Sequence, residues 1–211
     1  MVLYGPRPTE TDLAYNQLAR TREAPKPDGT VPEPYWNCTR NGVTFRIRAG
    51  THDPFGQYFS IITSVENQTV EYTMRNLVPA GTTVIDVGAA FGSYTLPFLV
   101  TGHPVHSFEL EPKAFHELMS QIRFNSDLIR PEHINCYNYG LWSSDITGDF
   151  YDMRDIKFRA LDNVLPDITN VSFVKIDVEG AELEVMKGGA QLLIRNQPAM
   201  QVVSFVLPDA G

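Results

Sequence analysis

The sequence predicts an α/β protein built on a doubly wound parallel sheet, and two observations support this prediction. From residue 81 onward, short apolar segments of strand length alternate with segments whose apolar residues have helical spacing. Strands that alternate with helices are joined by right-handed crossovers, which make the sheet parallel. The chain has 211 residues, enough for one large core but too few for two comfortable domains. We therefore expect one α/β domain at residues 81–211, preceded by an N-terminal extension.

The extension is predicted to have two parts. Residues 1–34 contain prolines that interrupt any long helix, so we expect a Pro-rich arm there. Residues 35–80 begin with two strand-like segments on either side of Asn41-Gly42, a dipeptide that favours a type I′ hairpin turn. Helical spacing then predicts one helix through Phe55, Phe59 and Ile62 and another from about Thr69 to Leu77. We interpret residues 35–80 as a hairpin and helical cap that precedes the main sheet.

The main domain is predicted from its alternating apolar segments. The predicted strands lie at residues 82–88, 104–110, 134–141, 171–178 and 199–207. The predicted helices lie at residues 91–100, 112–122, 161–165 and 181–196. Residues 144–152 predict a small hairpin with its turn at Thr147-Gly148, and Asp162 is expected to help start the short helix that follows.

The composition excludes several classes of protein. A formal net charge of −8 disfavours a nucleic-acid partner, because an acidic surface is repelled by phosphate backbones. The sequence contains neither a signal peptide nor an apolar run long enough for a membrane span. Cys38 and Cys136 lack the spacing of a zinc site or a disulfide framework. We therefore expect two reduced thiols in a cytoplasmic protein.

The segment VIDVGAAFGSYTL after the first predicted strand carries the strongest chemical signal. Gly88 and Gly92 let the backbone approach a ligand, and the following helix offers free N–H groups. Asp86 stands just before this turn, where a dinucleotide site would have to accept a pyrophosphate. A carboxylate repels phosphate but attracts the amino group and the sulfonium of S-adenosylmethionine (SAM). The alternative is a tight strand–helix turn in which Asp86 only caps the helix.

The next two strands predict the rest of a nucleoside site. Glu109 ends the second strand, where a carboxylate can accept both hydroxyls of an unphosphorylated ribose. Glu111, just before Pro112, competes for this role, but we expect it to stabilise the start of the next helix. Asn138 could hydrogen-bond an adenine amine and Tyr139 could cover the ring, although Tyr139 could equally belong to the core.

The fourth strand supplies the candidate catalytic residues. Alternate residues of a strand share a face, so Lys175, Asp177 and Glu179 are predicted to lie on one side of an extended segment. Lys175 could simply pair with either acid. Alternatively, Asp177 and Glu179 face the substrate, and one of them orients or deprotonates an attacking hydroxyl. A metal on these two carboxylates is a minority interpretation because no third ligand is evident, and we expect none.

Three stretches of the sequence resemble the FkbM-type SAM-dependent methyltransferases: VIDVGAAFGSYTL, SFELEP and VKIDVEGAELEVMKGG. The last is highly specific, whereas the first alone indicates only a class I methyltransferase. The resemblance covers about Glu71 to Phe205 and implies a Rossmann-like methyltransferase fold, SAM as donor, and O-methylation of hydroxyls on sugars, glycolipids or natural products. It implies that Asp177, Glu179 and Glu182 occupy the acidic motif of the family. The candidate cofactor-binding residues are Asp86, Gly88, Ala89, Phe91, Gly92, Glu109, Leu110, Asn138 and Tyr139.

Two departures from the family pattern accompany this resemblance. The family usually has Asn at the position of Ala90, so one polar contact of the cofactor turn is absent. The sequence stops at Gly211, just past the fifth predicted strand, so we expect the last two of the seven strands of a class I sheet to be lacking. An exposed sheet edge favours pairing, which predicts a homo-oligomer formed through that edge.

Three functions are weighed on this basis. The first is SAM-dependent methylation of a small-molecule or carbohydrate acceptor, with Asp177 and Glu179 as catalytic residues. The second is a non-catalytic SAM-binding or protein-interaction module with a truncated methyltransferase fold. The third is an NAD-dependent enzyme, and Asp86 argues against it because a carboxylate there repels the pyrophosphate of NAD.

Overall fold

The computed structural model of the chain describes residues 20–21, 35–48, 65–150 and 153–204. Its centre is a parallel sheet with the strand order β11-β10-β4-β5-β6. These strands are β4 (Thr83–Val87), β5 (Val105–Phe108), β6 (Ile134–Tyr137), β10 (Val171–Ile176) and β11 (Ala199–Val202). The chain runs outward from β4 to β6 and then returns to place β10 on the other side of β4. This order confirms the predicted doubly wound sheet, and its direction reverses between β4 and β10, where ligands of such sheets bind.

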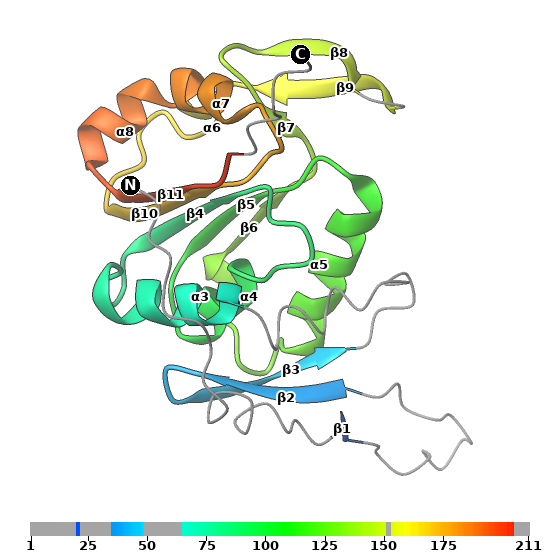
Figure 1. Ribbon diagram of the computed structural model, residues 1–211, viewed down its shortest axis with the longest axis vertical. Helices are drawn as coiled ribbons and strands as arrows, with labels where there is room; N and C mark the ends of the chain where they lie inside the picture. The colour runs from blue at the N-terminus through cyan, green and yellow to red at the C-terminus, as the bar shows by residue number, and fades with distance from the viewer. Residues whose placement is uncertain (1–19, 22–34, 49–64, 151–152, 205–211) are drawn as a thin grey trace, which may run out of the picture.

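Helices cover both faces of the sheet (Figure 1). One layer contains α3 (Val65–Asn76), α4 (Thr95–Val100) and α5 (Pro112–Phe124), and the other contains α6 (Leu161–Val164), α7 (Glu182–Gly188) and α8 (Ala190–Asn196). Each layer packs its own core against the sheet: Phe98 and Leu118 lie in one cluster, and Leu161 and Leu192 in the other. Because apolar side chains from both faces bury β4 completely, the site at its carboxyl end stands on a rigid base.

The predicted hairpin of the extension forms, and its buried side chains pack in the same core cluster as those of α4 and α5. Strands β2 (Tyr35–Arg40) and β3 (Val43–Arg48) pair in antiparallel fashion, and the two-residue β1 (Arg20–Thr21) joins them. The side chain of Asn125, which follows the last residue of α5, hydrogen-bonds the backbone N–H and C=O of Arg46 at 2.8 and 2.7 Å. The hairpin therefore packs beneath the helices (Figure 1).

Several predicted elements differ in extent from those observed. The predicted strand 134–141 is two strands: β6 stays in the central sheet, and β7 (Gly140–Leu141) joins a separate sheet with the order β7-β9-β8. Strands β8 (Ile146–Phe150) and β9 (Met153–Arg159) pair in antiparallel fashion, with Phe150 opposite Met153, so the predicted turn at Thr147-Gly148 is wrong: both residues are part of β8. The predicted helix 181–196 is divided at Gly189 into α7 and α8.

Helices α3 and α6 can also be compared with the helices predicted for these segments. Helix α3 contains most of the helix predicted from Thr69 to Leu77 but begins four residues earlier. Asp162 lies in the first turn of α6, where an acid favours the start of a helix, but its carboxylate does not cap α6; it accepts hydrogen bonds from the backbone N–H groups of Gln191 and Leu192 in α8. A short 3-10 helix, η1 (Pro131–His133), precedes β6. The predicted helix through Phe55, Phe59 and Ile62 and the end of the strand predicted at 199–207 lie outside the described residues.

Strand β11 is the edge of the central sheet in the part of the chain that the structure describes. Met200 and Val202 on this strand are each 40% exposed. Self-association through this edge stays a prediction. Among the described helices, none has both the length and the apolar character that crossing a membrane requires.

Candidate functional site

The turn that follows β4 is fixed between the ends of β5 and β10. The backbone N–H groups of Gly88 and Ala89 donate to the carbonyl of Phe108 at 2.9 and 3.0 Å. Gly88 has φ +75°, and a Cβ built on it would lie 1.8 Å from the carbonyl oxygen of Asp177. Only glycine fits this position, because both the backbone conformation and the close approach exclude a side chain. Gly92 has φ +96°, and a Cβ there would lie 2.8 Å from Leu118.

Asp86 lies directly beneath this turn and is completely buried. Its Oδ2 accepts hydrogen bonds from the backbone N–H and the hydroxyl of Thr95, at 3.1 and 2.7 Å. Asp86 therefore caps the first turn of α4, which was the alternative interpretation of this residue. Its Oδ1 forms no hydrogen bond with any described residue and lies 3.7 Å from the Lys175 ammonium. Because the carboxylate has no exposed surface, it can act on a ligand through its electric field and not by direct contact.

Glu109 follows β5 directly and points back to the glycine turn. Its Oε2 accepts from the N–H of Ala90 at 2.7 Å, and its Oε1 accepts from the N–H of Glu111 at 2.8 Å. Burial raises the pKa of Glu109, an effect that these two hydrogen bonds oppose. Glu111 accepts from the N–H of Ala114 and caps α5, the role predicted for it.

The residues after β6 lie beside Glu109. The side-chain amide of Asn138 donates to the carbonyls of Glu109 and Leu110, at 2.8 and 3.2 Å. The Tyr139 ring contacts the rings of Phe108 and Tyr137, with centroids 5.9 and 5.6 Å apart, so it is part of the core as well as a neighbour of Asn138. The structure therefore brings together four of the predicted cofactor residues: Glu109, Leu110, Asn138 and Tyr139.

Two other predicted cofactor residues, Ala89 and Phe91, pack their side chains against the core. Ala89 is buried in the core that α4 and α5 share with the sheet, and the Phe91 ring packs against the same core. Their side chains support the glycine turn from below. Ala90 is exposed and has φ +46°, a left-handed conformation that asparagine adopts more readily than alanine.

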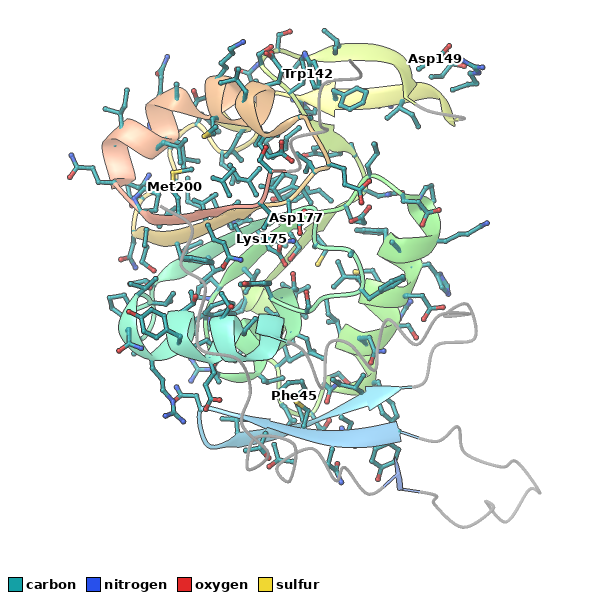
Figure 2. The ribbon with its side chains drawn as sticks, viewed as in Figure 1. Phe45, Trp142, Asp149, Lys175, Asp177 and Met200 are labelled. Carbon is teal, nitrogen blue, oxygen red and sulfur yellow. The ribbon has the colours of Figure 1, made fainter. Side chains whose placement is uncertain are left out.

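Lys175 joins the glycine turn to Asp177 (Figure 2). Its ammonium donates to the carbonyl of Gly88 at 2.7 Å and lies 3.6 Å from Oδ2 of Asp177. The simpler interpretation of this strand, a pair between Lys175 and Asp177 or Glu179, therefore holds for Asp177; the second acid beside Lys175 is Asp86 of β4, which that interpretation did not include. The Asp177 side chain is 31% exposed, so its carboxylate is accessible to a substrate, whereas Lys175 is not.

Glu179 does not share a strand face with Lys175 and Asp177, and this prediction was wrong. Strand β10 ends at Ile176, and Glu179 is an exposed turn residue with φ +53°. The cause is Glu182, whose buried Oε1 accepts from the N–H groups of Val178 and Gly180 at 3.3 and 2.9 Å and bends the chain. Sequence reasoning missed this structural role of Glu182; the available signal was an acid in the first turn of a predicted helix, close to backbone N–H groups that need an acceptor.

Groups of three or more His, Cys, Asp or Glu side chains that could hold a metal ion do not occur among the described residues. The site consists instead of a glycine turn, two buried carboxylates, one buried ammonium and one accessible carboxylate.

Comparison with known proteins gives the family. The FkbM methyltransferase domain matches residues 86–208, more than half of the chain. The chain belongs to the FkbM methyltransferase family. This agrees with the resemblance of its three motifs, and the match begins at the buried Asp86 and extends past β11.

One solved structure supports a methyltransferase fold, and a second is similar to this chain at a lower TM-score. Methyltransferase FkbM from Methylobacillus flagellatus KT is 24% identical over 58% of this chain and 32% of its own, with a TM-score of 0.51. The Pyrococcus abyssi tRNA (uracil-54, C5)-methyltransferase, in complex with S-adenosyl-L-homocysteine, is 13% identical over 83% of this chain and 36% of its own, with a TM-score of 0.46. This FkbM chain therefore spans about a third of the length of these two proteins. No curated protein matches it.

Proposed function

We propose that this FkbM-family chain transfers a methyl group from SAM to a hydroxyl of a small-molecule or carbohydrate acceptor. The observation that carries the proposal is the charge at the glycine turn: buried Asp86 and Glu109 flank it, and Lys175 is the buried lysine beside them. An excess of buried negative charge suits a ligand that carries a sulfonium and an amino group. The same negative charge repels a pyrophosphate, and it therefore disfavours the binding of a dinucleotide.

Each half of the donor has residues that fit it. The turn that contains Gly88 and Gly92, at the carboxyl end of β4, is the part we assign to the methionine half, above Asp86, whose Oδ1 accepts no hydrogen bond from the described residues. Glu109 is held at the end of β5 by two N–H groups, and its oxygens keep lone pairs for the ribose hydroxyls. Leu110, Asn138 and Tyr139 follow on the adenine side. When bound, SAM supplies a methyl group activated by the positive charge on sulfur.

Asp177 is the residue we assign to the acceptor. It follows β10 at the point where the sheet order reverses, its side chain is accessible, and Lys175 fixes one of its oxygens. Its role is to orient the acceptor hydroxyl and remove its proton as the methyl group is transferred. Glu179, on the exposed turn that follows, is the second candidate for contact with the acceptor.

Calorimetric titration tests the donor. We expect SAM and S-adenosylhomocysteine to bind and NAD not to bind. Glu109→Gln should weaken both ligands by about tenfold, since one hydrogen bond to a charged group is lost. Glu132→Gln removes an exposed carboxylate and serves as the matched control. Absence of SAM binding to the wild-type protein would refute the proposal.

Transfer is tested with methyl-labelled SAM and a panel of sugars, glycolipids and phenolic or aliphatic alcohols. Asp177→Asn should reduce transfer at least a hundredfold with little change in SAM affinity, because a general base contributes on this scale. Asp167→Asn, which removes an exposed carboxylate from the loop before β10, is the control. SAM binding without transfer to any acceptor, and with Asp177→Asn indistinguishable from wild type, would favour the non-catalytic module.

A further inference from the structure

Lys175 is the one buried lysine or arginine among the residues that the structure describes. Its side chain is 4% exposed and is surrounded on several sides. The ammonium hydrogen-bonds the Gly88 carbonyl, lies within 4 Å of oxygens of Asp86 and Asp177, and stands 5.6 Å from the centroid of the Tyr94 ring. A buried ammonium has a large desolvation cost unless such partners offset it, so its position is closely specified.

These contacts place one positive charge between two negative ones at the turn proposed to receive the methyl donor. With both carboxylates ionised, Asp86, Lys175 and Asp177 together carry a single net negative charge. Without Lys175 the same group would carry two. Because Asp86 Oδ1 has no hydrogen-bond donor among the described residues, Lys175 is the group that offsets its charge.

The net charge of these three side chains matters because the proposed reaction removes the positive charge on the sulfur of the donor at the glycine turn. The acceptor oxygen bonds to the methyl carbon as the carbon–sulfur bond breaks and its electron pair stays on sulfur. The sulfonium becomes a neutral thioether, and the hydroxyl proton passes to Asp177. A site with too much negative charge binds the cationic donor more tightly than the transition state, in which that charge is already dispersed, and this slows the reaction.

We propose that Lys175 sets the preference of this site between the cationic donor and its neutral product. It is a positioning residue that acts through Asp86, Asp177 and the Gly88 carbonyl, and it limits how strongly the site favours a sulfonium. The inference rests on the proposed function, since it requires a sulfonium donor at this turn.

The test compares the affinities for SAM and S-adenosylhomocysteine, which differ by the methyl group and the charge on sulfur. We expect Lys175→Met to raise the ratio of Kd for S-adenosylhomocysteine to Kd for SAM by about fivefold, the size of one added charge at roughly 8–10 Å in a partly screened site. Asp86→Asn should lower this ratio by a similar factor. The double variant Asp86→Asn/Lys175→Met should return it to the wild-type value, since the two charges are removed together.

Controls separate this role from a purely structural one. Lys187→Met removes an exposed lysine, 54% exposed in its pair with Glu184, and should leave the ratio unchanged. A structural lysine would change both affinities by the same factor, and an unchanged ratio in Lys175→Met would overturn the inference. If Lys175→Met does not fold because it leaves buried acids unpaired, Asp86→Asn and the double variant still decide, and equal ratios in both would overturn it. Wild-type protein that binds neither ligand would refute the proposed function itself, whereas tight binding with charge-independent ratios refutes only the role of Lys175.

Discussion

The carboxylate of Glu109 accepts a hydrogen bond from the backbone N–H of Ala90, with 2.7 Å between Oε2 and N. This contact joins the residue that follows β5 to the glycine turn that follows β4. Strands β4 and β5 are neighbours in the sheet, whereas Ala90 and Glu109 are 19 positions apart in the sequence. The contact therefore fixes the position of the turn and of the carboxylate at the same time.

The first prediction concerns the pH dependence of stability that Glu109 causes. Burial raises the pKa of Glu109 above its ordinary value of 4.5, so the folded state holds this proton more tightly than the unfolded state does. The resulting stability is fully present below pH 4.5 and is lost as the pH rises through the folded-state pKa. We expect the free energy of unfolding of the wild type, relative to Glu109→Gln, to fall as the pH rises from 4 to 7.

Urea unfolding of both proteins across this range measures the difference. The same experiment with Glu132→Gln, at an exposed site, should give a difference that is nearly constant with pH. A constant difference for Glu109→Gln as well would show that Glu109 ionises normally in the folded protein.

The second prediction separates the two reasons for glycine at position 88. Gly88 has φ +75°, and its Cβ position collides with the backbone of Asp177, whereas Gly102 has φ +90° with open space around it. Gly102→Ala should cost about 1–2 kcal/mol of unfolding free energy, the cost of a left-handed alanine. Gly88→Ala should cost at least about 3 kcal/mol and abolish SAM binding, because the ends of β4 and β10 must also separate. Equal costs for the two variants, measured by urea unfolding, would mean that the turn relaxes without moving Asp177.

The sequence predicted the features whose cause is local. Alternating apolar segments indicated the parallel sheet, and Asn41-Gly42 indicated the hairpin, in which both residues have positive φ (47° and 79°). Glu111 before Pro112 indicated a helix cap for the same reason: the partner, the N–H of Ala114, is three residues away.

Features that depend on distant partners could not be predicted in this way. The chain leaves the central sheet after Tyr137 where the amide of Asn138 binds two backbone carbonyls 28 and 29 residues earlier. The ammonium of Lys175 reaches the carbonyl of Gly88, 87 residues earlier. Periodicity assigns a residue to a face of a strand, but it does not show which backbone group of another strand lies there.

The third prediction concerns His106 in β5. Burial lowers its pKa to about 4 from the ordinary 6.5, so the folded state resists protonation that the unfolded state accepts. Stability is therefore lost as the pH falls from 6.5 toward 4. His106→Phe keeps a ring against Tyr137, with which His106 stacks at 6.1 Å, but cannot be protonated. We expect the Tm of the wild type to fall more than that of His106→Phe between pH 7 and pH 5, and parallel Tm curves would contradict the shift.

The fourth prediction concerns Ala90, a position at which the resemblance to the family leads us to expect Asn. Its φ of +46° costs alanine about 1 kcal/mol, and asparagine occupies this region more readily. Because the side chain is exposed, Ala90→Asn loses no packing, and the N–H that binds Glu109 stays in place. We expect Ala90→Asn to raise the free energy of unfolding by about 0.5–1 kcal/mol. The reverse change at a matched position, Asn41→Ala at φ +47° in the exposed hairpin turn, should lower it by a similar amount. A loss of stability in Ala90→Asn beside the expected loss in Asn41→Ala would show that the turn holds Ala90 for a reason other than its backbone conformation.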